Sequence, residues 1–358
     1  MKKNLKTAQQ PWLRSALADG LFILLPPFFS LLLVILFPQQ FKVSAVMPVQ
    51  YWIVLVVFID VAHVYSTLYR TYFNREKLYK QRTLLITIPM ACYFAGVLLY
   101  SVNGLLFWRV LAYLAVYHFI RQQYGFMRLY SRMEQTTKFS RWVDRLAIYS
   151  ATVYPILFWH FDGSRNFNWF VEGDFISYPS AVLTHIFTWL YLFIIAAYLL
   201  KEGLQIRRSQ HFNIPRNLLI AGTFLSWYFG IIYFNGDMAF TTLNVISHGI
   251  PYMALIWFFE QDDYRKQPGS KNKLSKVTFS RYGVWLFIVV IIFFAYVEEG
   301  LWDGLVWKEH KGVFSFFSSL SLINDATFLA MLIPLLALPQ STHYVLDGFI
   351  WRRRKQQN

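Results

Sequence analysis

The feature that most limits the fold of this chain is a long series of apolar segments separated by short polar ones. Ten such segments lie at residues 17–37, 48–68, 83–101, 105–127, 142–161, 180–200, 217–234, 241–259, 282–297 and 322–350. Most hold about 17–23 mainly apolar residues, the length an α-helix needs to cross a bilayer. Only 15% of the 358 residues are charged, too few for a soluble protein of this size. The sequence therefore predicts an all-α, polytopic transmembrane helix bundle of about ten spans, with residues 1–358 forming a single integral membrane domain.

Basic residues are distributed unevenly over the predicted loops. If the N-terminus is cytoplasmic, all but five of the 34 lysines and arginines lie on the cytoplasmic side. The five exceptions are Lys42, Arg109, Arg165, Lys308 and Lys311. This asymmetry follows the positive-inside rule and predicts cytoplasmic N- and C-termini in the inner (cytoplasmic) membrane of a bacterium. Topology accounts for the net charge of +15, and no separate basic domain remains for nucleic acid.

The last two segments carry helix-breaking and acidic residues. Pro334 and Pro339 interrupt residues 322–350, so this span is expected to be kinked or broken. Four acidic residues follow or end the ninth segment and are expected to be solvated on the outer side. They are Glu298, Glu299, Asp303 and Glu309.

Four of the eight histidines are expected at one depth in the membrane, each on a different helix. His63, His118, His248 and His343 lie at similar distances from the cytoplasmic ends of their segments, within roughly 7–8 Å along the membrane normal at 1.5 Å per residue. A lone intramembrane histidine is commonly a hydrogen-bonding contact between helices. Four at one depth are more economically explained by a single polar centre, and imidazole suits a transition metal. The other histidines lie elsewhere: His160 and His185 near the outer face, His211 and His310 in loops.

Two of these histidines have an acidic residue one helical turn away. Asp60 precedes His63 by three residues, and Asp347 follows His343 by four, so each pair shares a helix face. Pairs at this spacing build the metal sites of helix bundles. We expect the four histidines to be metal ligands. Asp60 and Asp347 are expected to serve as further ligands, as partners that orient an imidazole, or in catalysis.

Three further polar residues lie close to the histidines in sequence. Arg121 and Gln122 follow His118 by one turn, and Asn244 precedes His248 by four residues. Arg121 is a candidate catalytic residue that would hold a polar substrate end or a developing negative charge. Asn244 and Gln122 are cofactor-binding candidates, because a metal-bound imidazole donates its second N–H to an oxygen acceptor.

Three classes of function fit this residue set. The first is a non-haem, metal-dependent oxygenase or hydroxylase with one or two ions, iron above all and zinc as an alternative, acting on a membrane lipid, a terpenoid or another apolar small molecule. Its electrons would come from a separate reductase or from the substrate itself, since no flavin, nicotinamide or iron–sulfur motif is visible. The second is a haem-binding membrane electron-transfer protein, with paired histidines on facing helices. The third is a proton- or metal-coupled transporter, which would favour polar residues along a path across the membrane.

Two motifs carry a resemblance to known proteins. HFIRQQYG at residues 118–125 and STHYVLDGFIWR at residues 341–352 are similar to motifs of a poorly characterised family of bacterial multipass membrane proteins. The span pattern and the dispersed histidines also resemble the Brp/Blh-type membrane β-carotene dioxygenases. That resemblance implies an iron-dependent, multi-helix enzyme that cleaves an apolar polyene. The chain lacks the HxxxH and HxxHH clusters of membrane desaturases and alkane hydroxylases.

The predicted topology has a direct test. An even number of spans from a cytoplasmic N-terminus places the C-terminus in the cytoplasm. We therefore expect a reporter that is active only in the cytoplasm to be active when fused after Asn358, and a periplasmic reporter to be inactive there. Paired cytoplasmic and periplasmic reporters at this position would measure it. A periplasmic C-terminus would contradict the count of ten spans.

Overall fold

A computed structural model describes residues 10–42, 47–134, 136–163, 165–209, 212–266, 273–280 and 282–351. Within these ranges all regular secondary structure is helical, which confirms the prediction of an all-α chain. Every predicted site residue lies within them. His211 and the basic run at 352–355 lie outside the described residues.

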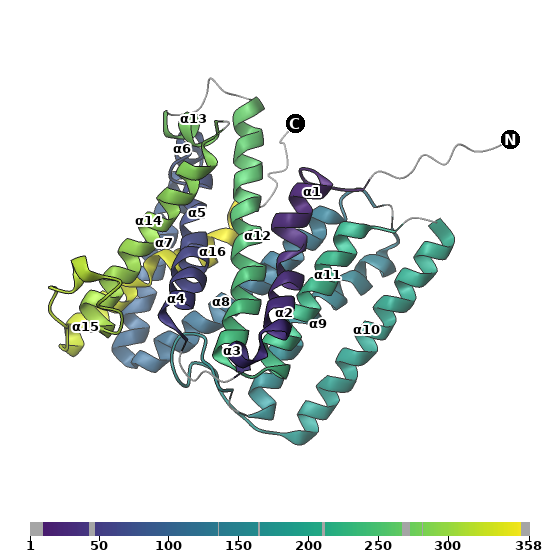
Figure 1. The fold of residues 1–358 in the computed structure, drawn as a ribbon, viewed down its shortest axis with the longest axis horizontal. Helices are drawn as coiled ribbons and strands as arrows, with labels where there is room; N and C mark the ends of the chain where they lie inside the picture. Colours follow the sequence, from purple (N-terminus) through teal and green to yellow (C-terminus); the bar gives the residue numbers. More distant parts are fainter. Residues whose placement is uncertain are drawn as a thin grey trace. The chain divides into compact units, whose positions relative to one another are not determined.

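Helices follow one another along the chain, and the connection between α9 and α10 is a longer loop (Figure 1). The first half of the chain contains α1 (Ala16–Asp19), η1 (Gly20–Leu24), α2 (Pro26–Leu36), α3 (Pro38–Lys42), α4 (Val49–Trp52), η2 (Ile53–Val61), α5 (Ala62–Arg70), α6 (Arg75–Lys80), α7 (Arg82–Val102), α8 (Gly104–Tyr130) and α9 (Lys138–Asp162). The second half contains α10 (Ala181–Ser209), α11 (Ile214–Trp227), η3 (Tyr228–Tyr233), α12 (Asp237–Lys266), α13 (Lys273–Thr278), α14 (Val284–Trp302), η5 (Asp303–Trp307), η6 (Ser315–Phe317), α15 (Ala326–Leu336) and α16 (Leu338–Ile350).

Each of the ten predicted apolar segments coincides with a helix or with consecutive helices. Among the described residues, five helices are long and apolar enough to cross a membrane, and up to seven spans result if each bent pair counts as one. These long apolar helices indicate a membrane protein. The count of ten spans, the cytoplasmic termini and the bacterial inner membrane stay predictions.

Two of the apolar segments are bent. α15 and α16 meet at 43°, with Pro334 inside α15 and Pro339 in the first turn of α16. The helices at 16–24 and 26–36 meet at 52°, where Pro26 begins α2. Proline has no backbone N–H and its ring clashes with the preceding turn, so a helix bends or ends there. The expected break in the last segment is confirmed.

Contacts divide the chain into two compact units. Unit 1 comprises residues 1–45, 119–167 and 176–251, and unit 2 comprises residues 46–118, 168–175 and 252–358. The divisions fall within α8, after His118, and within α12, after Pro251. That residues 1–358 form one integral membrane domain stays a prediction.

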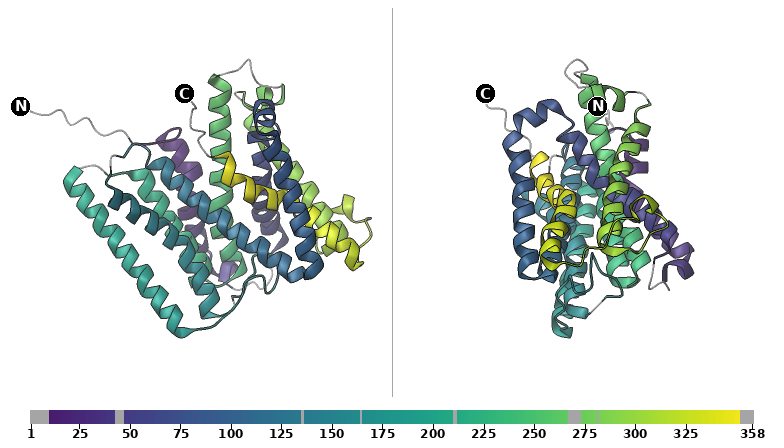
Figure 2. Two further views of the ribbon diagram at one scale, coloured as in Figure 1. Left: turned by 180° about the vertical axis from the view of Figure 1, so that it is seen from behind. Right: turned by 90° about the vertical axis from the view of Figure 1, so that its left-hand side faces the viewer.

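In unit 2, α5 packs against α14 and α16, and α7 packs along α15 and α16, coloured yellow-green and yellow in Figure 2. Gly96 of α7 permits this close approach, because a Cβ there would come within 2.8 Å of the Pro334 side chain. A core of aromatic and aliphatic side chains joins α5, α12 and α14 through buried Tyr69, Tyr252 and Phe287. Helix α16 is thus held on α5 and α7.

The expectation that the acidic residues near the end of α14 are solvated is wrong for two of them. Glu298 and Asp303 are only 4% and 3% exposed. Glu298 accepts a hydrogen bond of 2.6 Å from the Tyr65 hydroxyl, and Asp303 accepts one of 2.6 Å from the backbone N–H of His310. A buried carboxylate needs such donors because it has lost its hydration.

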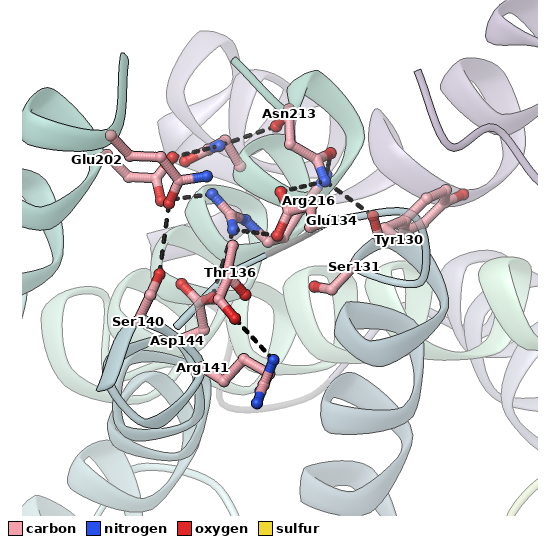
Figure 3. A network of polar contacts seen from close by, with 12 residues as sticks. Tyr130, Ser131, Glu134, Thr136, Ser140, Arg141, Asp144, Glu202, Asn213 and Arg216 are labelled. Atoms are coloured by element: carbon pink, nitrogen blue, oxygen red, sulfur yellow. Dashed lines mark hydrogen bonds and ion pairs between the residues drawn. The ribbon is translucent and has the colours of Figure 1, made fainter. Parts of the chain in front are cut away.

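Unit 1 is organised around α11, which packs against α2 and α9, and α10 packs along α9. At one end of these helices Arg216, the third residue of α11, is completely buried. Figure 3 shows its guanidinium among carboxylates from neighbouring segments. It lies 2.7 Å from Glu134 and 3.3 Å from Asp144, and it also pairs with Glu202.

The cluster around Arg216 is completed by a second cation and by amides. Lys201 of α10 pairs with both Asp144 and Glu202. Asn213 Nδ2 donates to Glu134 at 2.6 Å and to the carbonyl of Tyr130 at 2.8 Å. A planar guanidinium can satisfy several carboxylates at once, which a lysine ammonium cannot do in the same geometry. This cluster ties the ends of α8, α9, α10 and α11 together.

Replacing Arg216 should therefore be costly. We expect Arg216→Leu to lower the free energy of unfolding by about 3–5 kcal/mol, because it leaves buried carboxylates without their cation. Unfolding in detergent, followed by circular dichroism, would measure the loss. Arg208→Leu on exposed α10 surface is the matched control and should change stability by less than about 0.5 kcal/mol. Equal losses in the two variants would contradict a structural role for the cluster.

Candidate metal centre

Three buried histidines of unit 2 surround one point. His63 comes from α5, His118 from α8 and His343 from α16, and each is at most 2% exposed. The Nε2 atoms of His118 and His343 are 3.2 Å apart. The ring centroids of His63 and His343 are separated by 5.1 Å. Three imidazoles from distant parts of the sequence thus meet, with T-shaped contacts of His343 to His63 and to His118.

The fourth buried histidine, His248 of α12, belongs to unit 1. One ring nitrogen from each of His63, His118, His248 and His343 lies within 4.8 Å of the corresponding nitrogens of the others, and all four residues are buried. Four histidines so close together can hold a metal ion. The structure thus brings together the four residues that the sequence predicted at one membrane depth, and their role as ligands stays a prediction.

The spacing of one pair of nitrogen atoms fits ligands of a single ion. Metal–imidazole bonds of about 2.0–2.1 Å place two tetrahedral ligand nitrogens about 3.3 Å apart. The 3.2 Å between His118 and His343 matches that separation. Two uncharged imidazoles at this distance make one hydrogen bond at most, whereas an ion between them satisfies both lone pairs.

Asp347 lies behind the imidazole of His118, on the side away from the Nε2 atom that faces His343. Its Oδ2 is 3.5 Å from Nδ1 of His118. Its Oδ1 accepts hydrogen bonds from the Tyr252 hydroxyl at 2.8 Å and from Trp351 Nε1 at 2.6 Å. A carboxylate behind the second ring nitrogen fixes the tautomer and raises the basicity of a metal-binding imidazole. Asp347 is therefore positioned as a partner of the histidines, and it is not in the group of ligand atoms.

A chain of hydrogen bonds links Asp347 to His343. Tyr252 donates its only hydroxyl proton to Asp347, so its oxygen can only accept from the Thr67 hydroxyl, 3.2 Å away. The Thr67 oxygen then accepts from Nδ1–H of His343 at 2.7 Å. This order of donors leaves Nε2 of His343 unprotonated and facing His118. Residues of unit 2 alone thus set the tautomer that a metal requires.

Asp60 has a similar but looser relation to His63. Its Oδ1 is 3.7 Å from Nδ1 of His63, and its side chain is 37% exposed. Asp60 lies in η2, a π-helical stretch that ends immediately before α5. Such stretches rotate the side chains that follow them and are frequent at functional sites. Asp60, like Asp347, lies outside the group of four ligand atoms.

The two predicted amide residues lie in unit 1 and are both buried. Gln122 Nε2 donates to the backbone carbonyl of His248 at 3.0 Å, which holds that turn of α12. Asn244 Nδ2 donates to the carbonyl of Phe240 at 2.9 Å. A Cβ at Gly230 would come within 2.7 Å of that Nδ2 atom, so the glycine provides the room for Asn244. Gln122 contacts a histidine backbone, and the predicted cofactor-binding role of both amides stays a prediction.

Arg121, predicted to act on substrate, has an exposed side chain. Its Nη1 donates to the Tyr149 hydroxyl at 2.7 Å, and its guanidinium lies 5.1 Å from the centroid of the Tyr124 ring. These contacts give Arg121 a place on the surface of unit 1. Its catalytic role stays a prediction.

Sequence reasoning missed Thr67, Tyr252 and Trp351. Each lies four residues after a residue that was predicted: His63, His248 and Asp347. Positions i and i+4 share a helix face, so this spacing was a usable signal. Their hydroxyl and indole groups were not distinctive, because the chain contains 23 tyrosines and 13 tryptophans.

Comparison of the chain with protein-family models, with curated proteins and with solved structures finds no match.

The hydrogen-bond chain has a testable consequence for metal binding. We expect Thr67→Val and Tyr252→Phe each to weaken metal affinity about 10–100-fold, because His343 loses the contacts that fix its tautomer. Competition with a chromophoric chelator would measure the affinity. Thr71→Val is the matched control: Thr71 is buried one turn further along and donates to the carbonyl of Thr67. Metal affinity that is unchanged in both test variants would contradict the tautomer argument.

Proposed function

We propose that this protein is a membrane-embedded, metal-dependent oxidoreductase of the non-haem oxygenase or hydroxylase type. Its substrate would be an apolar molecule, such as a lipid or terpenoid, that reaches the site from the bilayer of a bacterial inner membrane. The supporting observation is the convergence of four buried histidines, with ring nitrogens within 4.8 Å of one another. Without an ion, four buried imidazoles could form few hydrogen bonds with one another, because each neutral ring has one N–H donor and one acceptor nitrogen.

Iron is the proposed metal. An all-imidazole set suits iron, copper, nickel and zinc, and zinc has no redox chemistry of its own. When bound, iron would supply the oxygen-activating step. The residues of the chain would hold and tune it: His63, His118, His248 and His343 as ligands, with Asp347 keeping Nε2 of His343 unprotonated. A separate reductase would supply electrons.

An apolar pocket beside the histidines supports an apolar substrate. This cavity in unit 2 has a volume of about 280 Å³ and is bordered by His343 and Thr67. Its remaining wall is mostly hydrocarbon, including Leu68, Pro89 and Leu338. Such a surface would bind a hydrocarbon chain by the hydrophobic effect and exclude water from the reaction. Thr67 thus contacts both the imidazole of His343 and the proposed substrate space.

A haem is a weaker alternative. Haem iron takes four nitrogens from the porphyrin and at most two from the protein. With all four imidazoles gathered at one point, two of them would occupy the space of the macrocycle. The geometry therefore favours a bare ion.

A proton-coupled transporter is the second candidate, and one observation favours it. The chain His343, Thr67, Tyr252 and Asp347 is continuous in hydrogen bonds, and such a chain can relay protons. In an enzyme the same chain would fix the tautomer of the imidazole. The two functions differ in whether the purified protein holds a metal.

Elemental analysis and a visible spectrum of detergent-purified protein would test the proposal. We expect about one equivalent of iron without a Soret band, lost in the double variant His118→Ala/His248→Ala because two ligands are removed. His160→Ala is the control and should keep the metal, since Nδ1 of His160 is hydrogen-bonded to the carbonyl of Ile156. A Soret band would support a haem protein. Protein prepared without chelators that holds no metal would favour the transporter.

A further inference from the structure

A second pocket in unit 2 has a quite different lining. It has a volume of about 270 Å³ and lies between the end of α4 with η2, the first turns of α8, the end of α14 with η5, and the loop around residue 170. Four tryptophans and three carboxylates contribute to its wall: Trp52, Trp108, Trp302, Trp307, Glu299, Asp303 and Glu309. This combination of π-faces and negative charge is not used by the proposed metal centre.

Three of the tryptophans, Trp108, Trp302 and Trp307, form a connected aromatic surface. The ring centroid of Trp302 is 5.9 Å from that of Trp108 and 5.9 Å from that of Trp307, and the planes of Trp302 and Trp307 are within 16° of parallel. Phe170 extends this surface at 5.7 Å from Trp108. The face of an indole ring carries partial negative charge and attracts a cation within about 6 Å of its centroid. Several such faces around one cavity favour a bulky, weakly hydrated cation.

The carboxylates add formal charge, and the lining contains no lysine or arginine among the residues that the structure describes. Asp303 is 3% exposed, and its Oδ2 has no hydrogen-bond partner within the described part of the chain. Lys308 is the nearest cation in sequence, but its Nζ donates to the carbonyls of Ser318 and Leu320 at 3.1 and 2.5 Å. In a chain of net charge +15, a pocket with three acids and no such base is selective for positive charge.

Hydrogen bonds within the loop at residues 170–174 hold the part of the pocket wall formed by Phe170 and Val171. Asp174 accepts hydrogen bonds from the backbone N–H groups of Phe170 and Val171, at 2.6 and 3.1 Å. Arg109 Nε donates to the carbonyl of Gly173 at 2.9 Å. The aromatic side of the pocket is therefore formed before any ligand arrives, which lowers the entropic cost of binding.

A divalent metal fits this pocket less well than an organic cation. Among the described residues, a group of His, Cys, Asp and Glu with ligand atoms close enough to hold a metal is found only at the histidine centre. Tryptophan donates no metal ligand, but its ring suits ammonium groups. The volume is near the lower end of small-molecule sites, which fits a headgroup-sized molecule.

We propose that this pocket binds an organic ammonium ion, such as a quaternary or protonated amine of the size of choline. The indole faces of Trp108, Trp302 and Trp307 would surround the alkylated nitrogen, and Glu299, Asp303 and Glu309 would neutralise its charge. The binding of a cation also relieves the mutual repulsion of the three carboxylates. The pocket does not depend on the metal centre, and either can fail without the other.

Calorimetric titration of the maltoside-solubilised protein with choline tests the proposal, with tryptophan fluorescence as a second readout. A detergent without an ammonium headgroup is essential, since the detergent would otherwise compete. We expect saturable binding of choline, and binding at least about tenfold weaker for its neutral isostere 3,3-dimethylbutan-1-ol, which keeps the shape but lacks the charge. Glu299→Gln and the rim substitution Glu309→Gln should each weaken choline binding about fivefold or more.

Controls separate this site from general surface charge and from the metal centre. Glu172→Gln removes an exposed acid of the same loop that does not line the pocket, and it should leave the affinity unchanged. His118→Ala should bind choline as the unaltered protein does. No saturable binding, equal affinity for the alcohol, equal weakening by Glu172→Gln, or displacement of choline by stoichiometric Ca²⁺ or Zn²⁺ would each overturn the proposal.

Discussion

The cost of placing a polar group in apolar surroundings is the constraint on which the rest of this structure depends. A chain with 56% hydrophobic residues offers little water to its buried polar atoms, so each must find a partner within the protein. Helices satisfy the backbone. Buried polar side chains form clusters in which they are partners of one another. In unit 1 Arg216 pairs with carboxylates, and in unit 2 Asp347 and Tyr252 lie beside histidines. Both clusters give buried polar side chains a partner, the first mainly through ion pairs and the second through hydrogen bonds and imidazole contacts.

Charge explains why one cluster is structural and the other is proposed to be functional. The Arg216 cluster contains its own cations, and each of its carboxylates meets a guanidinium or an ammonium group. The histidine group has one buried carboxylate, Asp347, and four imidazoles whose nitrogens converge. Its lone pairs are best satisfied by a cation that the chain does not contain. The proposed metal ion would thus accept electron pairs from the four imidazole nitrogens.

Acidic residues are scarce in this chain, with 19 against 34 lysines and arginines, and their positions are therefore informative. Several lie buried: Asp144 and Glu202 beside Arg216, Asp347 behind the imidazoles, and Asp303 beside the tryptophans. In unit 2 the pocket beside His343 is apolar, whereas the pocket at Asp303 is aromatic and acidic. The proposed substrate and the proposed ammonium ligand are accordingly different molecules held by different forces.

The sequence by itself determined the helices, the break at Pro334–Pro339, and the set of four histidines that converge. These follow from apolar length, from the missing N–H of proline and from distance along each helix, all of which are local quantities. Only the tertiary structure decided that Asp347 serves two imidazoles, that Thr67 and Tyr252 join it to His343, and that Asp303 is buried rather than solvated. Periodicity gives the face on which a residue lies, but not which neighbouring helix that face meets, because the rotation and tilt of each helix are set by packing against residues far away in sequence.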